Sequence, residues 1–389
     1  MPSRVLTNLG RVTDATTLNQ PITLPPQLLP SDGRFGSGPS KVRREAVQAL
    51  ADTGASYMGT SHRRPTVRSV VHRVRDGLAS LFSLPDGYEV LLGNGGSTLF
   101  WDAAAFGIVE RRAQHLVCGE FSSKFASVTR KAPHLDDPDV IESAPGTAPV
   151  AVANADVDVY AYPHNETSTG VMLPVVRPGT NGLVLVDGTS GAGGLRVDPN
   201  DFDGYYFAPQ KCFAGDGGIW LALCSPAAIE RIERIAATDR WIPPSLDLAI
   251  AVEQSRLDQT YNTPALATLF LLANQVEWML ENGGLEFAAG RCDTSAETIY
   301  AWADAGAHTT PYVTDPALRS HVTATIDFDT TVDAEALAKV LRANGILDVE
   351  PYRKLGRNQL RIGLFPAIEP ADVAILTQAI DYVIERLVV

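Results

Sequence analysis

The feature of this sequence that most constrains its fold is a repeated alternation of short apolar runs with longer segments of helical periodicity. The clearest run, GLVLVDGTSG at 182–191, closes on Asp187, and YEVLLGNGG at 88–96 stops on glycines before the helical segment 97–109. Continuous apolar runs are typical of parallel strands buried on both faces. A strand, a glycine-rich turn and a helix in succession form one parallel α/β unit. The sequence therefore predicts an α/β fold with a mainly parallel sheet.

The same alternation continues along the chain. Further strands are predicted at 114–119 and 157–167 and, as a pair around a lysine-bearing turn, within 205–224, with helices at 40–50, 66–84 and 121–132. After about Glu281, helix and strand alternate over 294–306, 322–329, 334–346, 360–365 and 371–389. We therefore expect a large domain over 40–284. We expect 1–39 and 285–389 to form an N-terminal arm plus a small C-terminal α+β domain.

Composition excludes several classes of protein. Of the 389 residues, 45% are hydrophobic and 20% are charged, which supports a packed core and argues against disorder. The net charge of −13 disfavours nucleic acid and anionic membranes as partners. No apolar window approaches the ~18 residues of a membrane span, and the N-terminus lacks the apolar core of a secretory signal.

The cysteines point to a reducing compartment. The four of them, Cys118, Cys212, Cys224 and Cys292, form no CxxC pair and have no histidine at zinc spacing. We therefore expect no metal site, and buried thiols in a cytoplasmic protein. A catalytic thiol stays an alternative, because Cys212 directly follows Lys211.

Lys211, in APQKCFAGDGG between two apolar strands, is the first candidate for chemistry. A lysine there is either a surface residue at a turn or a buried reactive amine. Asp187 ends a strand 24 residues earlier, which leaves room for one crossover to the neighbouring strand. A lysine and a carboxylate at neighbouring strand ends suit pyridoxal 5′-phosphate (PLP). The carboxylate keeps the pyridine nitrogen protonated, and the amine forms a Schiff base with the aldehyde.

A phosphate-binding turn is the second requirement. GNGGST at 93–98 stands at a strand-to-helix junction, where backbone N–H groups and two hydroxyls suit a phosphate, although a purely structural turn fits the same letters. Phe121 can stack on a cofactor ring or fill the core. Thr167 can contact the cofactor or cap a turn, and Asn262 and Thr263 fit a helix cap or a phosphate contact equally well.

Clusters of basic residues stand out in this acidic protein. The candidates for binding substrate anions are His62 and Arg63 in GTSHRRP, and Arg353, Arg357 and Arg361 in EPYRKLGRNQLRIG. A surface ion pair is the alternative for each of them. Arg361 is flanked by apolar residues, so we expect it to point from a strand into a site.

Six short strings occur in one order along nearly the whole chain: FGSGPS, GTSHR, HNETSTG, VDGTSGAGG, YYFAPQK and YNTPA. In these strings the sequence resembles the phosphoserine aminotransferases, which are class V enzymes of the PLP-dependent type I fold. FGSGPSKVR, SLPDGYEVLLGNGG and EPYRKLGRNQLR are similar to the actinobacterial branch of that family. The resemblance implies PLP as the cofactor, a large domain with a mainly parallel sheet, a smaller α+β domain, and a homodimer with shared active sites.

The resemblance also implies a role for each candidate. Lys211 is the Schiff-base lysine, and Asp187 pairs with the pyridine nitrogen. The other cofactor-binding residues that it implies are Gly96, Ser97, Phe121, Thr167 and Gln210, with Asn262 and Thr263 supplied by the second subunit. The substrate-binding residues that it implies are Arg361 for the α-carboxylate, and His62, Arg63 and Arg353 for the phosphate or the side-chain carboxylate.

The implied reaction moves an amino group from L-glutamate to 3-phosphohydroxypyruvate and gives O-phospho-L-serine and 2-oxoglutarate, a step of serine biosynthesis. The family also acts on 4-phosphohydroxythreonine in vitamin B6 synthesis. Three departures from the family pattern concern residues of the site. Phe121 stands where many members have Trp, Ser97–Thr98 where many have Gly-Arg, and Tyr352–Arg353 where many have His-Arg.

Three alternative functions are compatible with the same residues. A cysteine desulfurase of this fold class needs a thiol on a mobile loop, and neither Cys212 nor Cys292 has an obvious one. A transaminase of the alanine–glyoxylate type would not need His62 and Arg63. A cofactor-binding protein without turnover, or a phosphate-binding regulatory module, is compatible with the composition, although the presence of Lys211 argues against a decayed site.

Overall fold

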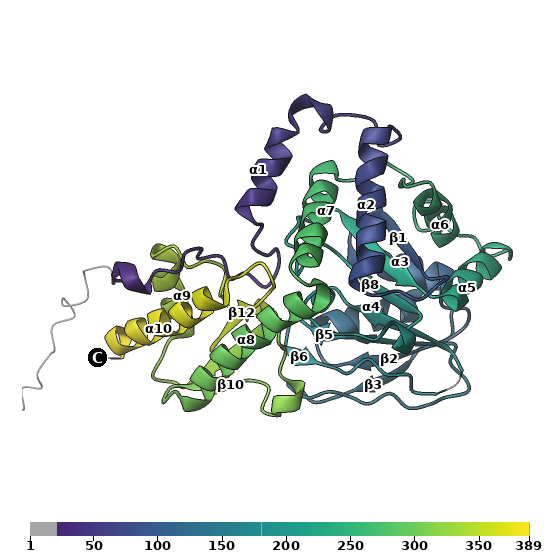
Figure 1. Cartoon of the computed structure of the whole chain (residues 1–389). Helices are drawn as coiled ribbons and strands as arrows, with labels where there is room; N and C mark the ends of the chain where they lie inside the picture. Colours follow the sequence, from purple (N-terminus) through teal and green to yellow (C-terminus); the bar gives the residue numbers. More distant parts are fainter. Residues whose placement is uncertain (1–21, 180, 389) are drawn as a thin grey trace, which may run out of the picture.

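The computed structural model describes residues 22–179 and 181–388, so most of the expected N-terminal arm, residues 1–21, lies outside the described residues. The two larger of the three sheets lie side by side, each with its own helices (Figure 1). The large sheet belongs to the first part of the chain, and the small sheet lies beside α8, α9 and α10. None of the helices in the described ranges has the length and apolar character that a membrane span requires.

The large sheet has seven strands in the order β1-β9-β8-β7-β4-β2-β3. Its strands are β1 (Glu89–Asn94), β2 (Ala113–Val117), β3 (Asp139–Glu142), β4 (Val159–Pro163), β7 (Leu183–Asp187), β8 (Gly204–Phe207) and β9 (Ile219–Cys224). Every neighbouring pair is parallel except the two pairs made by β9, which runs antiparallel to β1 and β8. The expected mainly parallel α/β sheet is confirmed.

Alternate residues of each strand face two separate cores, because successive side chains of a strand point to opposite faces. On β7, Val184 and Val186 belong to the core under α2 (Pro65–Leu81) and α7 (Leu266–Glu281). Leu183 and Leu185 belong to the other core. The helices over that second face are α3 (Ser97–Gly107), α4 (Glu120–Lys131), α5 (Pro226–Ala236) and α6 (Leu248–Arg256).

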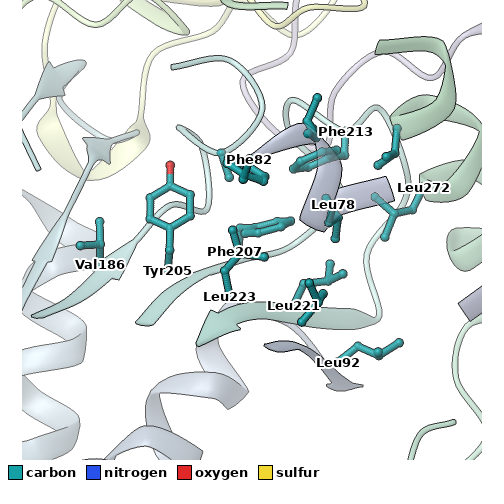
Figure 2. Packing of buried hydrophobic residues seen from close by; sticks show 14 of the residues in the cluster. Leu78, Phe82, Leu92, Val186, Tyr205, Phe207, Phe213, Leu221, Leu223 and Leu272 are labelled. Carbon is teal, nitrogen blue, oxygen red and sulfur yellow. The ribbon is translucent and has the colours of Figure 1, made fainter. Parts of the chain in front are cut away.

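The first of these cores is rich in aromatic rings. Figure 2 shows Phe82, Tyr205 and Phe207 packed among leucines of α2, α7 and the strands. The rings of Phe207 and Phe213 stack with centroids 4.9 Å apart, and Phe213 lies just beyond Lys211 in the chain. The connection that carries the lysine is therefore anchored in the core rather than free on the surface.

The small sheet is antiparallel and has the order β10-β11-β12. Its strands are β10 (Thr309–Pro311), β11 (Thr323–Phe328) and β12 (Gln359–Gly363), and its helices are α8 (Gly284–Ala305), α9 (Ala334–Ala343) and α10 (Pro370–Leu387). These elements share one core, which also contains Leu24 and Phe35 from the N-terminal part of the chain. Residues 22–36 therefore pack with the C-terminal unit.

The remaining elements are short. They are α1 (Arg44–Asp52), the two-residue strands β5 (Asn165–Glu166) and β6 (Val171–Met172), and the 3₁₀ turns η1 (Pro26–Leu28), η2 (Gly54–Ser56), η3 (Pro199–Asp201), η4 (Pro316–Leu318) and η5 (Arg353–Leu355). The helix predicted from Ser40 begins only at Arg44. The reason is that Ser40 bonds elsewhere: its N–H donates to the Gln210 carbonyl at 2.9 Å, and its hydroxyl donates to the Lys211 carbonyl at 2.6 Å.

Candidate active site

Lys211 lies in the connection between β8 and β9 and is 9% exposed, which decides between the two readings of this lysine in favour of a buried amine. Its Nζ donates a hydrogen bond to the Ser37 carbonyl at 2.5 Å. Burial and the positive charge of Arg361 lower the pKa of Lys211 to about 8. An amine with such a pKa is neutral in about a tenth of the molecules at pH 7, which is far more than for an ordinary lysine, and the neutral form is the nucleophile or base.

The backbone at Gly38 lies directly against this amine. A β-carbon at residue 38 would lie 2.1 Å from Nζ of Lys211, and the φ of Gly38 is +129°. Glycine is the residue that adopts such a φ without strain and leaves room for the lysine. The stretch 37–40 thus covers Lys211 on one side and fixes where its side chain runs.

Asp187 is the last residue of β7 and faces the same cavity as Lys211. Its carboxylate accepts a hydrogen bond from the Thr189 N–H at 2.8 Å and one from Nε1 of Trp101 at 3.3 Å. Burial raises the pKa of Asp187 despite these bonds. A carboxylate held in one orientation in a water-poor place stabilises a positively charged partner that enters the cavity.

The cavity has a volume of about 410 Å³. Seven of the predicted site residues line it, namely Gly96, Ser97, Phe121, Thr167, Asp187, Gln210 and Lys211. It opens at the carboxyl ends of β1, β4 and β7, where ligands gather in parallel sheets. A larger groove of about 1280 Å³ is lined by Arg196, Asp293 and His321 but contains neither the lysine nor Asp187, so volume alone does not locate the chemistry.

The N-terminus of α3 forms one end of the cavity. Gly96 caps the helix in an extended conformation without a side-chain cap, so the first N–H groups of α3 have no capping partner. The hydroxyl of Ser97 accepts a hydrogen bond from Thr189 Oγ1 at 2.7 Å. Such a helix start, lined by hydroxyls, binds a phosphate through its N–H groups and its dipole.

Two unpaired polar atoms show that this cavity is built for a polar ligand. Oε1 of Gln210 and Oδ1 of Asn165 are buried and have no hydrogen-bond partner, although both residues line the cavity. Buried polar atoms are normally paired. An amine, a carboxylate and a helix N-terminus together fit the aldehyde, ring nitrogen and phosphate of PLP, and the two amide oxygens would accept hydrogen bonds from donor groups of a ligand.

Phe121 and Thr167 line the cavity, whereas Arg361 does not line it but bonds to Thr167. Phe121 is in the first turn of α4, and the hydroxyl of Thr167 donates to Ser190 Oγ at 2.8 Å. Arg361 is on β12, and its Nη1 donates to the Thr167 carbonyl at 3.3 Å. Its Nε is buried without a partner, so the guanidinium has donors left for an anion.

Four other predicted site residues come together, but away from this cavity. Nδ1 of His62 lies 3.1 Å from Thr263 Oγ1, and Arg63 donates to Gln259 Oε1 at 2.5 Å. Asn262 belongs to the same exposed loop as Thr263. Arg353 is exposed in η5 and also does not line the cavity. None of His62, Arg63, Asn262, Thr263 and Arg353 lines the cavity of its own chain, and the expectation that Asn262 and Thr263 come from a second subunit stays a prediction.

The thiol alternative finds no support in this geometry. Cys212 and Cys292 are fully buried in one apolar cluster. Sγ of Cys212 donates to the Ser190 carbonyl at 3.2 Å, and burial raises the pKa of both thiols. A thiol that attacks a substrate is exposed and has a lowered pKa. No cluster of three metal-binding side chains occurs within residues 22–179 and 181–388.

Sequence reasoning missed several residues that shape the site. Trp101 and Thr189 hold Asp187, Asn165 offers an unpaired amide, and Ser37 and Gly38 surround the amine. Two local signals were available: Thr189 lies two residues beyond the strand-ending carboxylate, and Trp101 lies one helical turn after Ser97. Ser37 is 174 residues from Lys211, and no local pattern joins them.

Comparison with known proteins gives one consistent result. The aminotransferase class-V family model matches residues 141–348. A phosphoserine aminotransferase from Rhodococcus jostii is 58% identical over 366 residues, which cover 94% of this chain and 98% of that protein. The two are therefore related over almost their whole length.

Solved structures agree on the fold. A phosphoserine aminotransferase from Cytophaga hutchinsonii has a TM-score of 0.81 at 25% identity, over 90% of this chain and 99% of that one. A PLP-bound phosphoserine aminotransferase from Trichomonas vaginalis has a TM-score of 0.76 at 20% identity, over 90% of this chain and 99% of that one. The type I fold expected from the sequence is thus confirmed.

Proposed function

This chain belongs to the class V aminotransferases and, within them, to the phosphoserine aminotransferase family, and from that premise we propose the reaction of its site. It is a PLP-dependent enzyme whose substrates are amino acids and oxo acids. We propose that it transfers the amino group of L-glutamate to 3-phosphohydroxypyruvate, giving O-phospho-L-serine and 2-oxoglutarate in serine biosynthesis. The observation that carries the proposal is one cavity holding the Lys211 amine, the Asp187 carboxylate and the N-terminus of α3.

PLP, when bound, supplies an aldehyde for amines and a ring that accepts electrons from the substrate Cα. With PLP bound, Lys211 would hold the aldehyde carbon, and its amine, once free, would be the group that takes and returns the proton of the substrate Cα. A pKa of about 8 suits this shuttle, because the amine then exchanges its proton readily near neutral pH. Ser37 and Gly38 keep Nζ within reach of that proton.

The other cavity residues bind and orient. The Asp187 carboxylate, fixed by Thr189 and Trp101, binds the protonated ring nitrogen. The N–H groups of α3 and the Ser97 hydroxyl would bind the cofactor phosphate, and the side-chain N–H2 group of Gln210 could donate to it as well. Phe121 packs on the ring face and excludes water from it.

The large and small sheets supply different parts of this machinery. Lys211 and Asp187 come from the large sheet, whereas Arg361 comes from β12 of the small sheet. We propose that a domain over 40–284 binds the cofactor, and that 285–389 with the arm at 1–39 forms the domain that brings Arg361 to the substrate α-carboxylate. The separate cores of the two sheets support this division.

The second anion of the substrate needs its own cations. We propose that His62, Arg63, Asn262 and Thr263 of one subunit complete the site of a second subunit in a homodimer, with Arg353 beside them. The support is their common position in a largely exposed cluster that does not line the cavity of their own chain, together with the exposed apolar side chains of Met58, Leu257 and Tyr261. Paired cations there would bind either a phosphate or a side-chain carboxylate.

Two narrower proposals follow from the same site. The cations that bind a phosphorylated amino acid would also bind 4-phosphohydroxythreonine, so we propose a role in vitamin B6 synthesis as well. The four cysteines are buried free thiols, which suits a reducing cytoplasm as the place where the enzyme acts.

A comparison of amino donors tests the proposed substrate. The PLP-loaded enzyme is assayed with 2-oxoglutarate and either O-phospho-L-serine, L-alanine or L-cysteine. We expect turnover with O-phospho-L-serine at least about 100-fold above that with L-alanine, because the second anion adds a charge-assisted contact of about 3 kcal/mol. Equal rates with L-alanine, or sulfide release from L-cysteine, would contradict the proposal.

A further inference from the structure

The strongest unexplained feature of the site is the side chain that lies against Arg361. The guanidinium carbon of Arg361 lies 5.1 Å from the centre of the Tyr352 ring. That ring is in turn 5.9 Å from the ring of Phe121, at an interplanar angle of 54°. Tyr352 therefore contacts both Arg361 and the aromatic ring of Phe121, which lines the cavity.

The segment that carries Tyr352 contacts α4, a helix that packs on the large sheet. Tyr352 is the residue that precedes η5, and two residues later Lys354 forms an ion pair with Glu120 in the first turn of α4. Glu120 also pairs with Lys124 at 3.3 Å. These contacts hold η5 against the helix that carries Phe121, so the tyrosine connects elements of the two sheets.

Arg361 has few other contacts that fix its position. Its Nη1 makes a long hydrogen bond to the Thr167 carbonyl, and its Nε is buried without a partner. Burial lowers the pKa of this guanidinium, while Tyr352 and Glu166 favour its charged form. An arginine side chain has several free rotations, and holding it in one orientation removes much of the entropy that binding a carboxylate would otherwise cost.

We propose that Tyr352 is a positioning residue that holds Arg361, through a cation–π contact, in the orientation that binds the α-carboxylate of the amino acid or oxo acid. The inference rests on the proposed function, which assigns the α-carboxylate to Arg361. A cation over an aromatic face is attracted by the ring's quadrupole, and most strongly where water is excluded. The aromatic ring, rather than the hydroxyl, carries the effect.

Arg357 makes a similar contact with a tyrosine ring, but its charge is paired within the protein. Arg357 lies over the Tyr312 ring at 4.6 Å, the same kind of contact. Its guanidinium, however, is neutralised by a two-pronged ion pair with Asp327, with Nε–Oδ1 at 3.1 Å. Arg357 is thus held within the protein and has no charge to offer a substrate. The pair Tyr312–Arg357 is a matched control for the pair Tyr352–Arg361.

The test is a double-mutant cycle on the PLP-loaded enzyme. Tyr352→Leu, Tyr352→Phe and Tyr312→Leu are compared with the parent enzyme, and Tyr352→Leu is also made in an Arg361→Ala background. We expect Tyr352→Leu to raise KM for both the amino acid and the oxo acid about five- to tenfold while kcat changes less, because ground-state binding is lost. Tyr352→Phe and Tyr312→Leu should stay within about twofold of the parent.

The cycle separates a positioning role from a structural one. If Tyr352 acts through Arg361, Tyr352→Leu should change KM by less than about twofold in the Arg361→Ala background. The inference is overturned if Tyr352→Leu raises KM by the same factor in both backgrounds, or if Tyr352→Phe raises KM as much as Tyr352→Leu does. The cycle is measured with whichever amino donor the parent enzyme uses. If the proposed substrate is wrong, the parent enzyme fails to use it, but the cycle can still be measured with another donor.

Discussion

The backbone of Gly38 passes so close to the Lys211 amine that a β-carbon at residue 38 would lie 2.1 Å from Nζ and 2.5 Å from Cε. The two residues are far apart in the sequence, yet the contact decides where the Lys211 side chain points within the cavity. The N–H···O bond from Nζ to Ser37 at 2.5 Å belongs to the same contact. The stretch 37–40 is therefore part of the site and not merely a link between the two sheets.

The first prediction concerns this contact. Gly38→Ala should displace Lys211 and strain a φ of +129°, lowering the free energy of unfolding by about 1–3 kcal/mol and turnover at least about tenfold. Gly290→Ala is the matched control, because a β-carbon there meets nothing within 4 Å. Thermal unfolding and steady-state rates of both variants check the prediction. Wild-type rates in Gly38→Ala would show that the close approach is unimportant.

The second prediction concerns pH. The pKa of Lys211 is lowered to about 8 in the folded protein. The rate at which the apo-enzyme takes up PLP should therefore rise about tenfold per pH unit below pH 8 and stay constant above it. The unfolded chain keeps an ordinary lysine pKa and binds more protons between the two values. The free energy of unfolding should therefore rise with pH above about 8, since protonation of the buried amine opposes folding.

The charge of Arg361 contributes to that lowered pKa. Arg361→Gln should therefore move the midpoint of the PLP-uptake profile to higher pH, whereas Arg357→Gln, which removes an arginine already paired with Asp327, should leave it in place. Uptake is followed by the visible absorbance of the lysine-linked cofactor. A profile that does not move in Arg361→Gln would mean that burial alone sets the pKa of Lys211.

The third prediction concerns Asp187. Asp187→Asn removes the charge opposite the ring nitrogen and should lower turnover by about 100-fold or more. The apo-protein should gain about 1 kcal/mol or keep its stability, because burial raises the pKa of this carboxyl and its charge is a cost to the empty fold. Calorimetry of the apo- and PLP-loaded forms separates the two effects. A destabilised apo-protein would indicate that Asp187 serves the fold rather than the cofactor.

The fourth prediction concerns the shared site. Lys211→Ala and Arg63→Gln homodimers should each be inactive with O-phospho-L-serine. If Arg63 acts in the partner's site, a mixed dimer contains one site with both lesions and one intact site, so random mixing should restore roughly a quarter of the activity. Co-expression with two tags and purification on both isolates the mixed dimer, which should then have about half of the wild-type activity. No recovery would mean that Arg63 does not work across the interface.

Much of the site could be predicted because its residues stand at recognisable strand ends. Asp187 closes the clearest apolar run, Gly96 and Ser97 stand where a strand meets a helix, and Lys211 lies between two strands. In a parallel sheet such positions converge on one edge. The order of the strands and the antiparallel direction of β9 could be read only from the structure.

Other features left no local trace in the sequence. The edge strand β3 is short and only half-buried, so its residues have no clear apolar alternation. The delayed start of α1 depends on Ser40 bonding to residues more than 160 positions away. Tyr352 gains its importance from two rings and a guanidinium that meet only in the folded chain. Contacts of this kind are set by packing rather than by propensity.

The most direct test of the account is an absorbance spectrum of the PLP-loaded protein before and after adding O-phospho-L-serine without an oxo acid. The account predicts a visible band that Lys211→Ala lacks, that O-phospho-L-serine bleaches completely, and that L-alanine at the same concentration leaves largely unchanged. A band that persists with O-phospho-L-serine but bleaches with another amino acid would contradict the proposed substrate. The absence of any band after PLP is added would contradict the assignment of the Lys211–Asp187 cavity itself.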